Sequence, residues 1–398
     1  MRQQQLRIPS LSVWLCCGLL CCAGNPARAG ADENVERLKT SLESAGKNRV
    51  QIQKALDDVP AAERAGMQFL VANMPDRDLR ELTAEFLLDN VRLAYKAWNE
   101  SPWKNDVPQE IFFNDVLPYA SINERRDSWR KEFYEKFSPL IKDAKTPAEA
   151  AGLLNQKVFP LVNVHYSTKR PKADQSPQES IKAGLASCTG LSVLLIDACR
   201  SVGVPARFVG VIWADNSGNH SWTEVWDHGW HFTGAAEPAG GKLDQAWFAS
   251  KAGTAVRDEP LHAIYATSYR RTPLKFLFAW DPNIDYVYAF NVTDRYAAGK
   301  VDPPEGTVPA QFRVLDGKSG DRCPASLKIT DAAGRTVFEG TTKDERFDAN
   351  DHLSMYLLPG QEYQVEIRHA AHELKTNFKC ERRDTPYTWK LEPSGEKK

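Results

Sequence analysis

The clearest hydrophobic periodicity in this chain lies between residues 187 and 205. Ser187 is a good N-cap residue, and Gly203 followed by Pro205 supplies a helix stop. Together with the apolar spacing these signals predict a helix whose first turn carries Cys188, where the positive end of the helix dipole favours a thiolate. The apolar positions that recur on one helical face are Leu191, Leu194, Leu195, Ala198 and Val202.

Residues 30–145 have the patterns of a mostly helical N-terminal region. One helical stripe runs from Leu79 to Val91, and a charged helix is predicted from Glu124 to Phe137. The aromatic residues between these segments fit core packing, and no catalytic grouping stands out there. A further helix is predicted from Ala148 to Val158.

After the Cys188 helix the period changes from helical to strand-like. Strands are predicted at 206–213, 220–226 and 230–236, with a tight hairpin at 227–229 that sets Trp226 opposite Trp230 and His220 opposite Ala236. A helix followed by strands, without a βαβ repeat, indicates an α+β core over residues 146–300.

A proline-rich break at residues 301–306 ends this core. Beyond it, short alternating runs are separated by Gly and Asp turn signals, and this pattern predicts a small antiparallel β-sandwich over residues 301–398.

The first 29 residues read as a secretory signal peptide. Arg2 and Arg7 precede an apolar run that is short for a membrane span, and a small-x-small cleavage pattern ends at Ala29. A lipoprotein signal at Cys21 or Cys22 is disfavoured, because the bulky Leu19 and Leu20 precede the two cysteines. We therefore expect a secreted or periplasmic protein with no membrane span after signal removal.

Composition narrows the function classes. The signal takes three of the 51 basic residues and none of the 52 acidic ones, so the mature chain has a net charge of about −4. This balance does not favour nucleic acid or an anionic membrane. Four cysteines remain. Cys188 and Cys199 are separated by about 16 Å along one helix, too far to pair, whereas Cys323 and Cys380 are predicted to form a disulfide.

Nucleophilic cysteine chemistry needs a base, and an acidic group to orient that base. His220 begins a predicted strand beside the Cys188 helix, and Glu237 follows the neighbouring strand. Strict alternation points Glu237 to the opposite face, but Pro238 favours a local distortion that brings it to His220.

Three motifs then carry a family resemblance: residues 187–190 (Ser-Cys-Thr-Gly), 198–207 and 219–226 (Asn-His-Ser-Trp-Thr-Glu-Val-Trp). Together they resemble the transglutaminase-like superfamily over about residues 160–250. Residues 75–79 and the C-terminal sandwich resemble flanking segments of its exported bacterial members. The resemblance implies a papain-like fold with Cys188 as nucleophile and His220 as base. The family's usual third residue is an aspartate, but Gly234 stands at that position here. Glu237 is the first candidate for the third role and Asp244 the second.

The resemblance implies acyl transfer on amide bonds of peptides or proteins, by hydrolysis or transamidation, without a metal or organic cofactor. The alternative is a catalytically inactive scaffold or adhesion protein, which the missing aspartate motivates. His228 and His231 form an H-x-x-H pair that lacks further ligands for a metal. The C-terminal module is expected to bind a cell-surface protein or carbohydrate.

Overall fold

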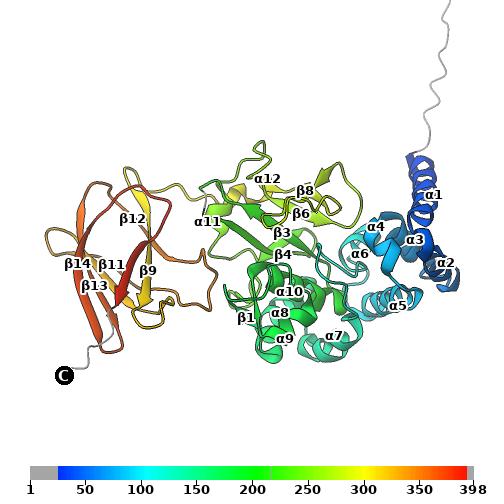
Figure 1. Cartoon of the computed structure of the whole chain (residues 1–398), viewed down its shortest axis with the longest axis horizontal. Helices are drawn as coiled ribbons and strands as arrows, with labels where there is room; N and C mark the ends of the chain where they lie inside the picture. The colour runs from blue at the N-terminus through cyan, green and yellow to red at the C-terminus, as the bar shows by residue number, and fades with distance from the viewer. Residues whose placement is uncertain (1–25, 216, 392–398) are drawn as a thin grey trace, which may run out of the picture.

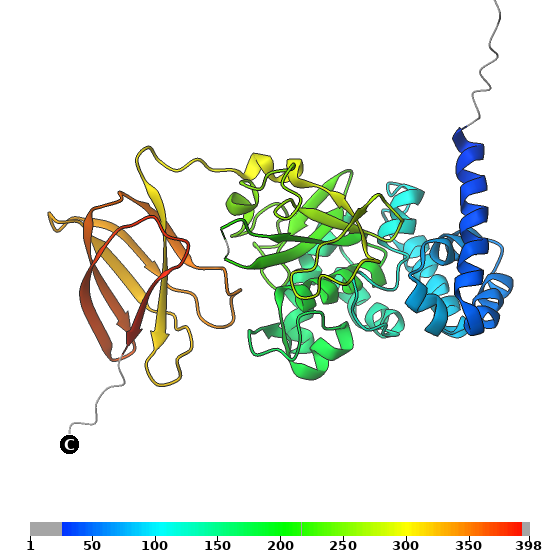
Figure 2. The ribbon, with the colours of Figure 1, turned by 45° about the horizontal axis from the view of Figure 1, so that its top comes forward.

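The structure, a computed structural model, describes residues 26–215 and 217–391. Figures 1 and 2 show three parts in a row: N-terminal helices, a mixed core and a C-terminal β-sandwich. The greater part of the predicted signal peptide, residues 1–25, lies outside the described residues. No helix in the described part of the chain is long and apolar enough to cross a membrane.

The N-terminal region is helical, but two of its predicted helices have different bounds. The stripe from Leu79 to Val91 is divided, because Thr83 accepts a hydrogen bond from the Phe86 N–H and caps a new helix. The segment that starts at Glu124 is a loop as far as Trp129, since the Glu124 carboxylate accepts backbone N–H groups upstream of it. The helices are α1 (Pro26–Ser44), α2 (Arg49–Asp58), α3 (Arg64–Asn73), α4 (Asp76–Glu81), α5 (Ala84–Glu100), α6 (Gln109–Asp115) and α7 (Arg130–Phe137), with short 3₁₀ turns at Gly46–Asn48 and Ser138–Ile141.

The core is a six-stranded antiparallel sheet with helices against it, in the strand order β5-β4-β3-β6-β8-β7. The predicted α+β class is confirmed. Its helices are α8 (Pro147–Val162), α9 (Pro177–Ala183), α10 (Cys188–Ser201), α11 (Ala249–Ala252) and α12 (Thr293–Tyr296), the last followed by a 3₁₀ turn at Ala297–Gly299. Its sheet strands are β3 (Ala206–Ile212), β4 (Asn219–Trp226), β5 (Trp230–Thr233), β6 (Tyr265–Ser268), β7 (Leu274–Lys275) and β8 (Tyr288–Asn291), and β1 (His165–Tyr166) pairs separately with β2 (Leu185–Ala186).

The N-terminal helices and the core share one hydrophobic cluster, which extends from Ala45 to Ala289. Polar contacts also cross between the two parts. The Trp103 indole donates to the Gly203 carbonyl at 2.8 Å, and the Arg130 guanidinium donates to the Arg200 carbonyl at 2.9 Å. The helical region therefore fixes the C-terminal end of α10, the helix that carries Cys188.

The C-terminal part is a sandwich of two sheets around its own cluster, in the orders β11-β10-β13-β14 and β12-β9-β15. The pairing is antiparallel except between β9 and β15, which run parallel. Cys323 and Cys380 are buried here as free thiols, so the predicted disulfide is not formed. The strands are β9 (Val308–Asp316), β10 (Ser326–Thr330), β11 (Thr336–Thr341), β12 (Leu353–Leu357), β13 (Glu362–His369), β14 (His372–Lys379) and β15 (Tyr387–Leu391).

Candidate active site

Cys188 is the first residue of α10, as the sequence predicts. The Ser187 hydroxyl accepts a hydrogen bond from the Gly190 N–H at 3.2 Å and donates to the Ala173 carbonyl at 2.7 Å. At the helix start the backbone N–H groups have no intrahelical acceptor and face outward. Cys188 is partly exposed, whereas Cys199 is fully buried in the same helix.

His220 lies near the start of β4, where it pairs with Val211 of β3. The side chain is only 1% exposed and packs among aromatic rings, with the Trp247 and Phe248 ring centres each 4.8 Å away. The neighbouring residue Ser221 contacts the Thr189 hydroxyl at 3.2 Å, so β4 is joined to α10 beside the thiol. The predicted nucleophile and base are thus brought together.

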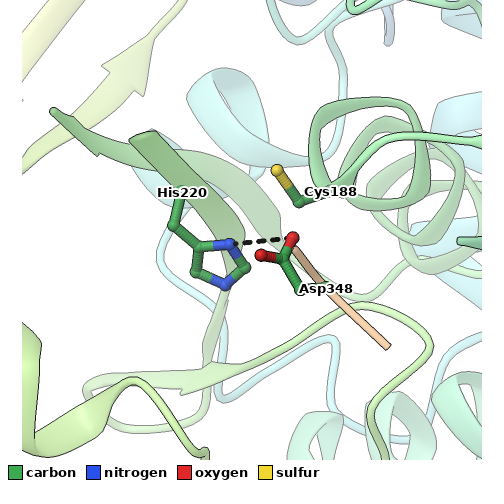
Figure 3. Close-up of side chains that lie close together, drawn as sticks. All are labelled: Cys188, His220 and Asp348. Atoms are coloured by element: carbon green, nitrogen blue, oxygen red, sulfur yellow. Dashed lines mark ion pairs between the residues drawn. The ribbon is translucent and has the colours of Figure 1, made fainter. Parts of the chain in front are cut away.

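The third residue at this site comes from the C-terminal sandwich. Asp348 lies in the connection between β11 and β12, which extends from the sandwich to the core (orange in Figure 1). Its Oδ2 is 3.5 Å from His220 Nδ1, and one ligand atom each of Cys188, His220 and Asp348 lie within 4.8 Å of one another. Figure 3 shows the thiol and the carboxylate on the Nδ1 side of the imidazole.

Hydrogen bonds between two domains, the core and the C-terminal sandwich, hold this connection in place. The Ala349 N–H donates to the Tyr166 hydroxyl at 2.9 Å, and the Asn350 amide donates to the Asn219 carbonyl, next to His220, at 3.2 Å. Asn350 also donates to Asp348 Oδ1 from its backbone and its side chain, at 2.9 and 3.0 Å. The carboxylate is therefore oriented by its own loop.

The buried Arg322 supports the same connection from inside the sandwich. Its guanidinium donates to the carbonyls of Asp348 at 3.1 Å and Asp351 at 3.3 Å, and also to the carbonyl of Phe347. Because one rigid group contacts three carbonyls of this connection, the turn that presents Asp348 is built into the sandwich fold.

The charged forms of His220 and Asp348 stabilise each other. Burial alone would lower the pKa of His220, but the Asp348 carboxylate and the Cys188 thiol raise it well above the ordinary value. Burial alone would raise the pKa of Asp348, but His220 and the Asn350 hydrogen bonds lower it. The geometry thus favours an imidazolium facing a carboxylate.

Glu237 lies at the edge of the site, but its hydrogen bond goes elsewhere. Its Oε2 accepts from the Trp247 indole at 2.9 Å, and that indole packs on the His220 ring. A side chain at Gly234 would collide with this carboxyl, since a Cβ there would lie 2.2 Å from Oε2. Glu237 therefore fills the space beside residue 234, where the family's aspartate stands, and its predicted role in orienting His220 stays a prediction.

The predicted pairing of His220 with Ala236 is wrong. The β4–β5 hairpin starts with Trp226 opposite Trp230, as predicted, but the pairing ends with Thr223 opposite Thr233. Beyond Thr233 the backbone is hydrogen-bonded to Asn155 of α8 instead of to β4. The Asn155 side chain donates to the Gly234 carbonyl at 2.8 Å and accepts from the Ala236 N–H at 2.9 Å.

Asp244 and His231, the second histidine of the H-x-x-H pair, form a separate group. His231 Nδ1 lies 2.6 Å from Asp244 Oδ2, and Asp244 Oδ1 accepts the Phe232 N–H at 2.9 Å. His231, and not His220, is thus the histidine that Asp244 contacts. Burial alone would lower the pKa of His231, but the hydrogen bond with Asp244 raises it.

A cavity of about 740 Å³ adjoins the site at the boundary between the two domains. From the core it is bordered by Tyr166, Leu191, Glu237 and Trp247, and the β11–β12 connection contributes Phe347, next to Asp348. Its walls are mainly apolar. The sandwich therefore shapes this cavity as well as contacting His220.

Comparison with known proteins finds a family match for part of the core. Residues 136–235, which include Cys188 and His220, match the family model of the transglutaminase-like superfamily. No curated protein matches the chain.

Solved structures similar to the chain include a candidate cysteine protease from Cytophaga hutchinsonii, with 16% identity over 47% of this chain and a TM-score of 0.26. Red sea bream transglutaminase is 8% identical over 70% of this chain, with a TM-score of 0.29. The chain spans 65% of the length of each of these proteins. The family assignment rests on the match of residues 136–235.

Proposed function

We propose that this protein is an exported cysteine-dependent acyl-transfer enzyme that acts on amide bonds of peptides or proteins. One observation carries the proposal: a partly exposed thiol at a helix N-terminus meets a buried histidine whose partner is a buried carboxylate. Such a grouping has the parts that nucleophilic cysteine catalysis requires.

The reaction follows from the positions of these groups. His220 takes the Cys188 proton, and the thiolate attacks the amide carbonyl carbon to form a tetrahedral intermediate. The Cys188 backbone N–H at the start of α10 donates to the oxyanion. The imidazolium protonates the amide nitrogen, the C–N bond breaks and a thioester remains. Water then gives a free acid, or a second amine gives a new amide.

Asp348 acts on His220 rather than on the substrate. Its carboxylate faces Nδ1 at 3.5 Å and stabilises the imidazolium that forms in the first step. The cavity at the domain boundary is proposed to receive the substrate chain next to the thiol. Its mainly apolar lining favours a peptide segment with apolar side chains.

Export and the partners of the C-terminal module belong to the same proposal. The charged, apolar and small-residue pattern of residues 1–29 supports a signal peptide and a secreted or periplasmic location. Binding of a cell-surface protein or carbohydrate by the sandwich stays a prediction.

Labelling with iodoacetamide at neutral pH tests the nucleophile. Cys188 is expected to react much faster than the buried Cys199, whose pKa is raised to about 12 by burial. His220→Ala should remove the difference, and Cys199→Ser is the matched control that should leave the fast phase intact. Equally slow labelling of both cysteines would favour the inactive scaffold.

The second step is identified by mass spectrometry. A peptide library incubated with the protein and a primary amine should show cleavage or amine incorporation that is lost in Cys188→Ser. Unchanged peptides together with a reactive Cys188 would contradict action on peptide amides while leaving the nucleophile in place.

A further inference from the structure

Three different metal-ligating groups converge at the junction of the two domains. The Cys188 thiol comes from α10, the His220 imidazole from β4 and the Asp348 carboxylate from the β11–β12 connection. In the described part of the chain, this is the one group of three such side chains whose ligand atoms lie within 4.8 Å of one another. His220 and Asp348 are buried, and Cys188 is partly exposed.

The arrangement differs from a linear relay. In a relay the acid and the nucleophile contact opposite nitrogens of the histidine ring. Here Figure 3 shows the thiol and the carboxylate on the same side of the ring, so that the three groups surround a common point. A cation at that point satisfies all three groups at once.

The distance between His220 and Asp348 and the unsatisfied atoms agree with such a cation. The 3.5 Å between His220 Nδ1 and Asp348 Oδ2 is long for a charged hydrogen bond, and neither atom has a hydrogen-bond partner among the described residues. Tetrahedral Zn²⁺ with bonds of about 2.0–2.3 Å separates its ligand atoms by about 3.4–3.6 Å. The other carboxylate oxygen is held by Asn350, which is the support that metal-binding carboxylates usually have.

We propose that Cys188, His220 and Asp348 form a reversible Zn²⁺ site that fastens the C-terminal sandwich onto the catalytic core and blocks the thiol. Binding forms the Zn–S, Zn–N and Zn–O bonds, and the protons held on the Cys188 sulfur and on His220 Nδ1 pass to solvent, while Nε2 keeps its proton. The fourth position is left to water. The blocking of acyl transfer rests on the proposed function, whereas the binding of Zn²⁺ does not.

Zinc binding is measured directly on the full mature chain, kept reduced with a phosphine and freed of metal by a chelator. Competition against a chromophoric chelator should give one tight Zn²⁺ per chain, and Co²⁺ should show a tetrahedral spectrum with a thiolate band. Asp348→Asn and His220→Ala should each weaken binding at least about tenfold. The matched control is Asp351→Asn, which removes a neighbouring loop carboxylate and should bind as the wild type does.

A labelling experiment connects binding to the thiol. Zn²⁺ should protect Cys188 of the wild type from iodoacetamide, and the chelator should restore labelling. At the same Zn²⁺ concentration Asp348→Asn should stay unprotected.

Three results would overturn the zinc site. They are the absence of stoichiometric binding, an affinity that Asp348→Asn leaves unchanged, and acyl transfer that requires the ion. If Zn²⁺ binds as expected but metal-free protein neither labels fast nor acts on peptides, the zinc site stands and the proposed function fails.

Discussion

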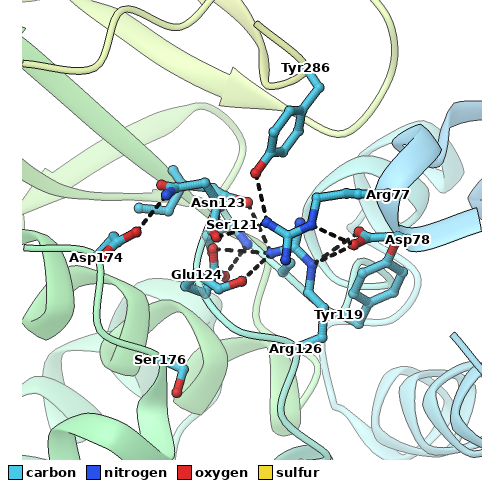
Figure 4. A network of polar contacts seen from close by, with 12 residues as sticks. Arg77, Asp78, Tyr119, Ser121, Asn123, Glu124, Arg126, Asp174, Ser176 and Tyr286 are labelled. Atoms are coloured by element: carbon cyan, nitrogen blue, oxygen red, sulfur yellow. Dashed lines mark hydrogen bonds and ion pairs between the residues drawn. The ribbon is translucent and has the colours of Figure 1, made fainter. Parts of the chain in front are cut away.

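Two buried charged clusters in this molecule differ in how completely their groups are paired. In the N-terminal region the Arg126 guanidinium donates to both oxygens of Asp78, at 3.2 and 3.0 Å, and to two backbone carbonyls. Tyr119 donates to Asp78 at 2.8 Å, and Glu124 accepts the backbone N–H groups of residues 121 and 122 (Figure 4). Every charge in this cluster has several short partners.

The second cluster is Cys188, His220 and Asp348. Both ring nitrogens of His220 and one oxygen of Asp348 lack a hydrogen-bond partner among the described residues. A saturated buried ion network specifies structure, because removing one member leaves the others unpaired. A buried network with unpaired polar atoms can use those atoms to bind a substrate, a proton or a metal. The comparison predicts opposite results for substitutions in the two clusters.

The largest expected effect is on the reaction. Cys188→Ala should lower acyl transfer by about 10³-fold or more, because no other group supplies the nucleophile. The free energy of unfolding should change by less than about 1 kcal/mol, since Cys188 is partly exposed and sits outside any saturated network. Product formation and urea unfolding of the same preparation measure both quantities. A large loss of stability would show that the thiol is a structural group.

The saturated cluster should respond in the opposite way. Arg126→Met removes the buried cation that faces both Asp78 and Glu124, leaves Asp78 with only the half-exposed Arg77 at 3.5 Å, and should lower the free energy of unfolding by about 3–5 kcal/mol. In the folded protein, the rate at which iodoacetamide labels Cys188 should be unchanged.

The neighbouring arginine is the control for that substitution. Arg125 pairs with Asp127 at 2.7 Å, but its side chain is 55% exposed, so Arg125→Met should cost about 1 kcal/mol or less. Equal losses for the two variants would mean that pairing within the cluster has no special effect on stability.

A smaller effect is expected where the two domains meet. Asp348 raises the pKa of His220, so Asp348→Asn should shift the loss of imidazolium to lower pH by about 1–3 pH units. In metal-free buffer the pH profile of Cys188 alkylation by the anionic reagent iodoacetate reports this shift, because the imidazolium attracts the reagent and the basic limb follows the deprotonation of His220.

Asp351→Asn again serves as the control, because Asp351 belongs to the same connection but His220 Nδ1 faces Asp348. A basic limb that moves equally in both variants would indicate a general effect of loop charge. An unmoved limb in Asp348→Asn would mean that the carboxylate does not govern His220.

The sequence was enough to predict the elements that carry Cys188 and His220, but not the third residue of the site. Ser187 and Cys188 could be placed because capping, helical period and the Gly203 stop are local signals. His220 followed from a strand pattern and a motif. Such local signals define α10 and β4, the two elements that carry the predicted nucleophile and base.

No comparable local pattern in the sequence marks Asp348 as a site residue. It sits in a connection between two sandwich strands, and it reaches His220 only because contacts such as Tyr166 with Ala349 dock one domain on the other. Domain docking depends on tertiary geometry that no local pattern encodes. Gly234 stands where the resemblance implies an aspartate, and the Glu237 carboxyl lies directly beside it.

The smallest expected effect concerns Glu237 and the pH dependence of stability. Burial, together with the charges of Asp348 and Asp351, raises the pKa of Glu237 from 4.5 to about 8, against the lowering effect of His220 and Trp247. Between these values the folded protein keeps a proton that the unfolded chain releases. The folded state therefore loses stability as the pH rises from 4.5 to 8.

Glu237→Gln removes this titration while retaining an oxygen for the Trp247 indole. The variant should match the wild type near pH 4.5 and exceed its free energy of unfolding by about 1–3 kcal/mol near pH 8.5, as urea unfolding at both pH values can measure. Trp247→Phe is the companion variant, because loss of the indole N–H raises the pKa of Glu237 further and should steepen the decline. A Gln variant that loses stability at pH 8.5 would show instead that the folded protein stabilises the Glu237 carboxylate, so that its pKa is not raised. In that case it would be free to serve as the acid that orients His220, as the sequence first suggested.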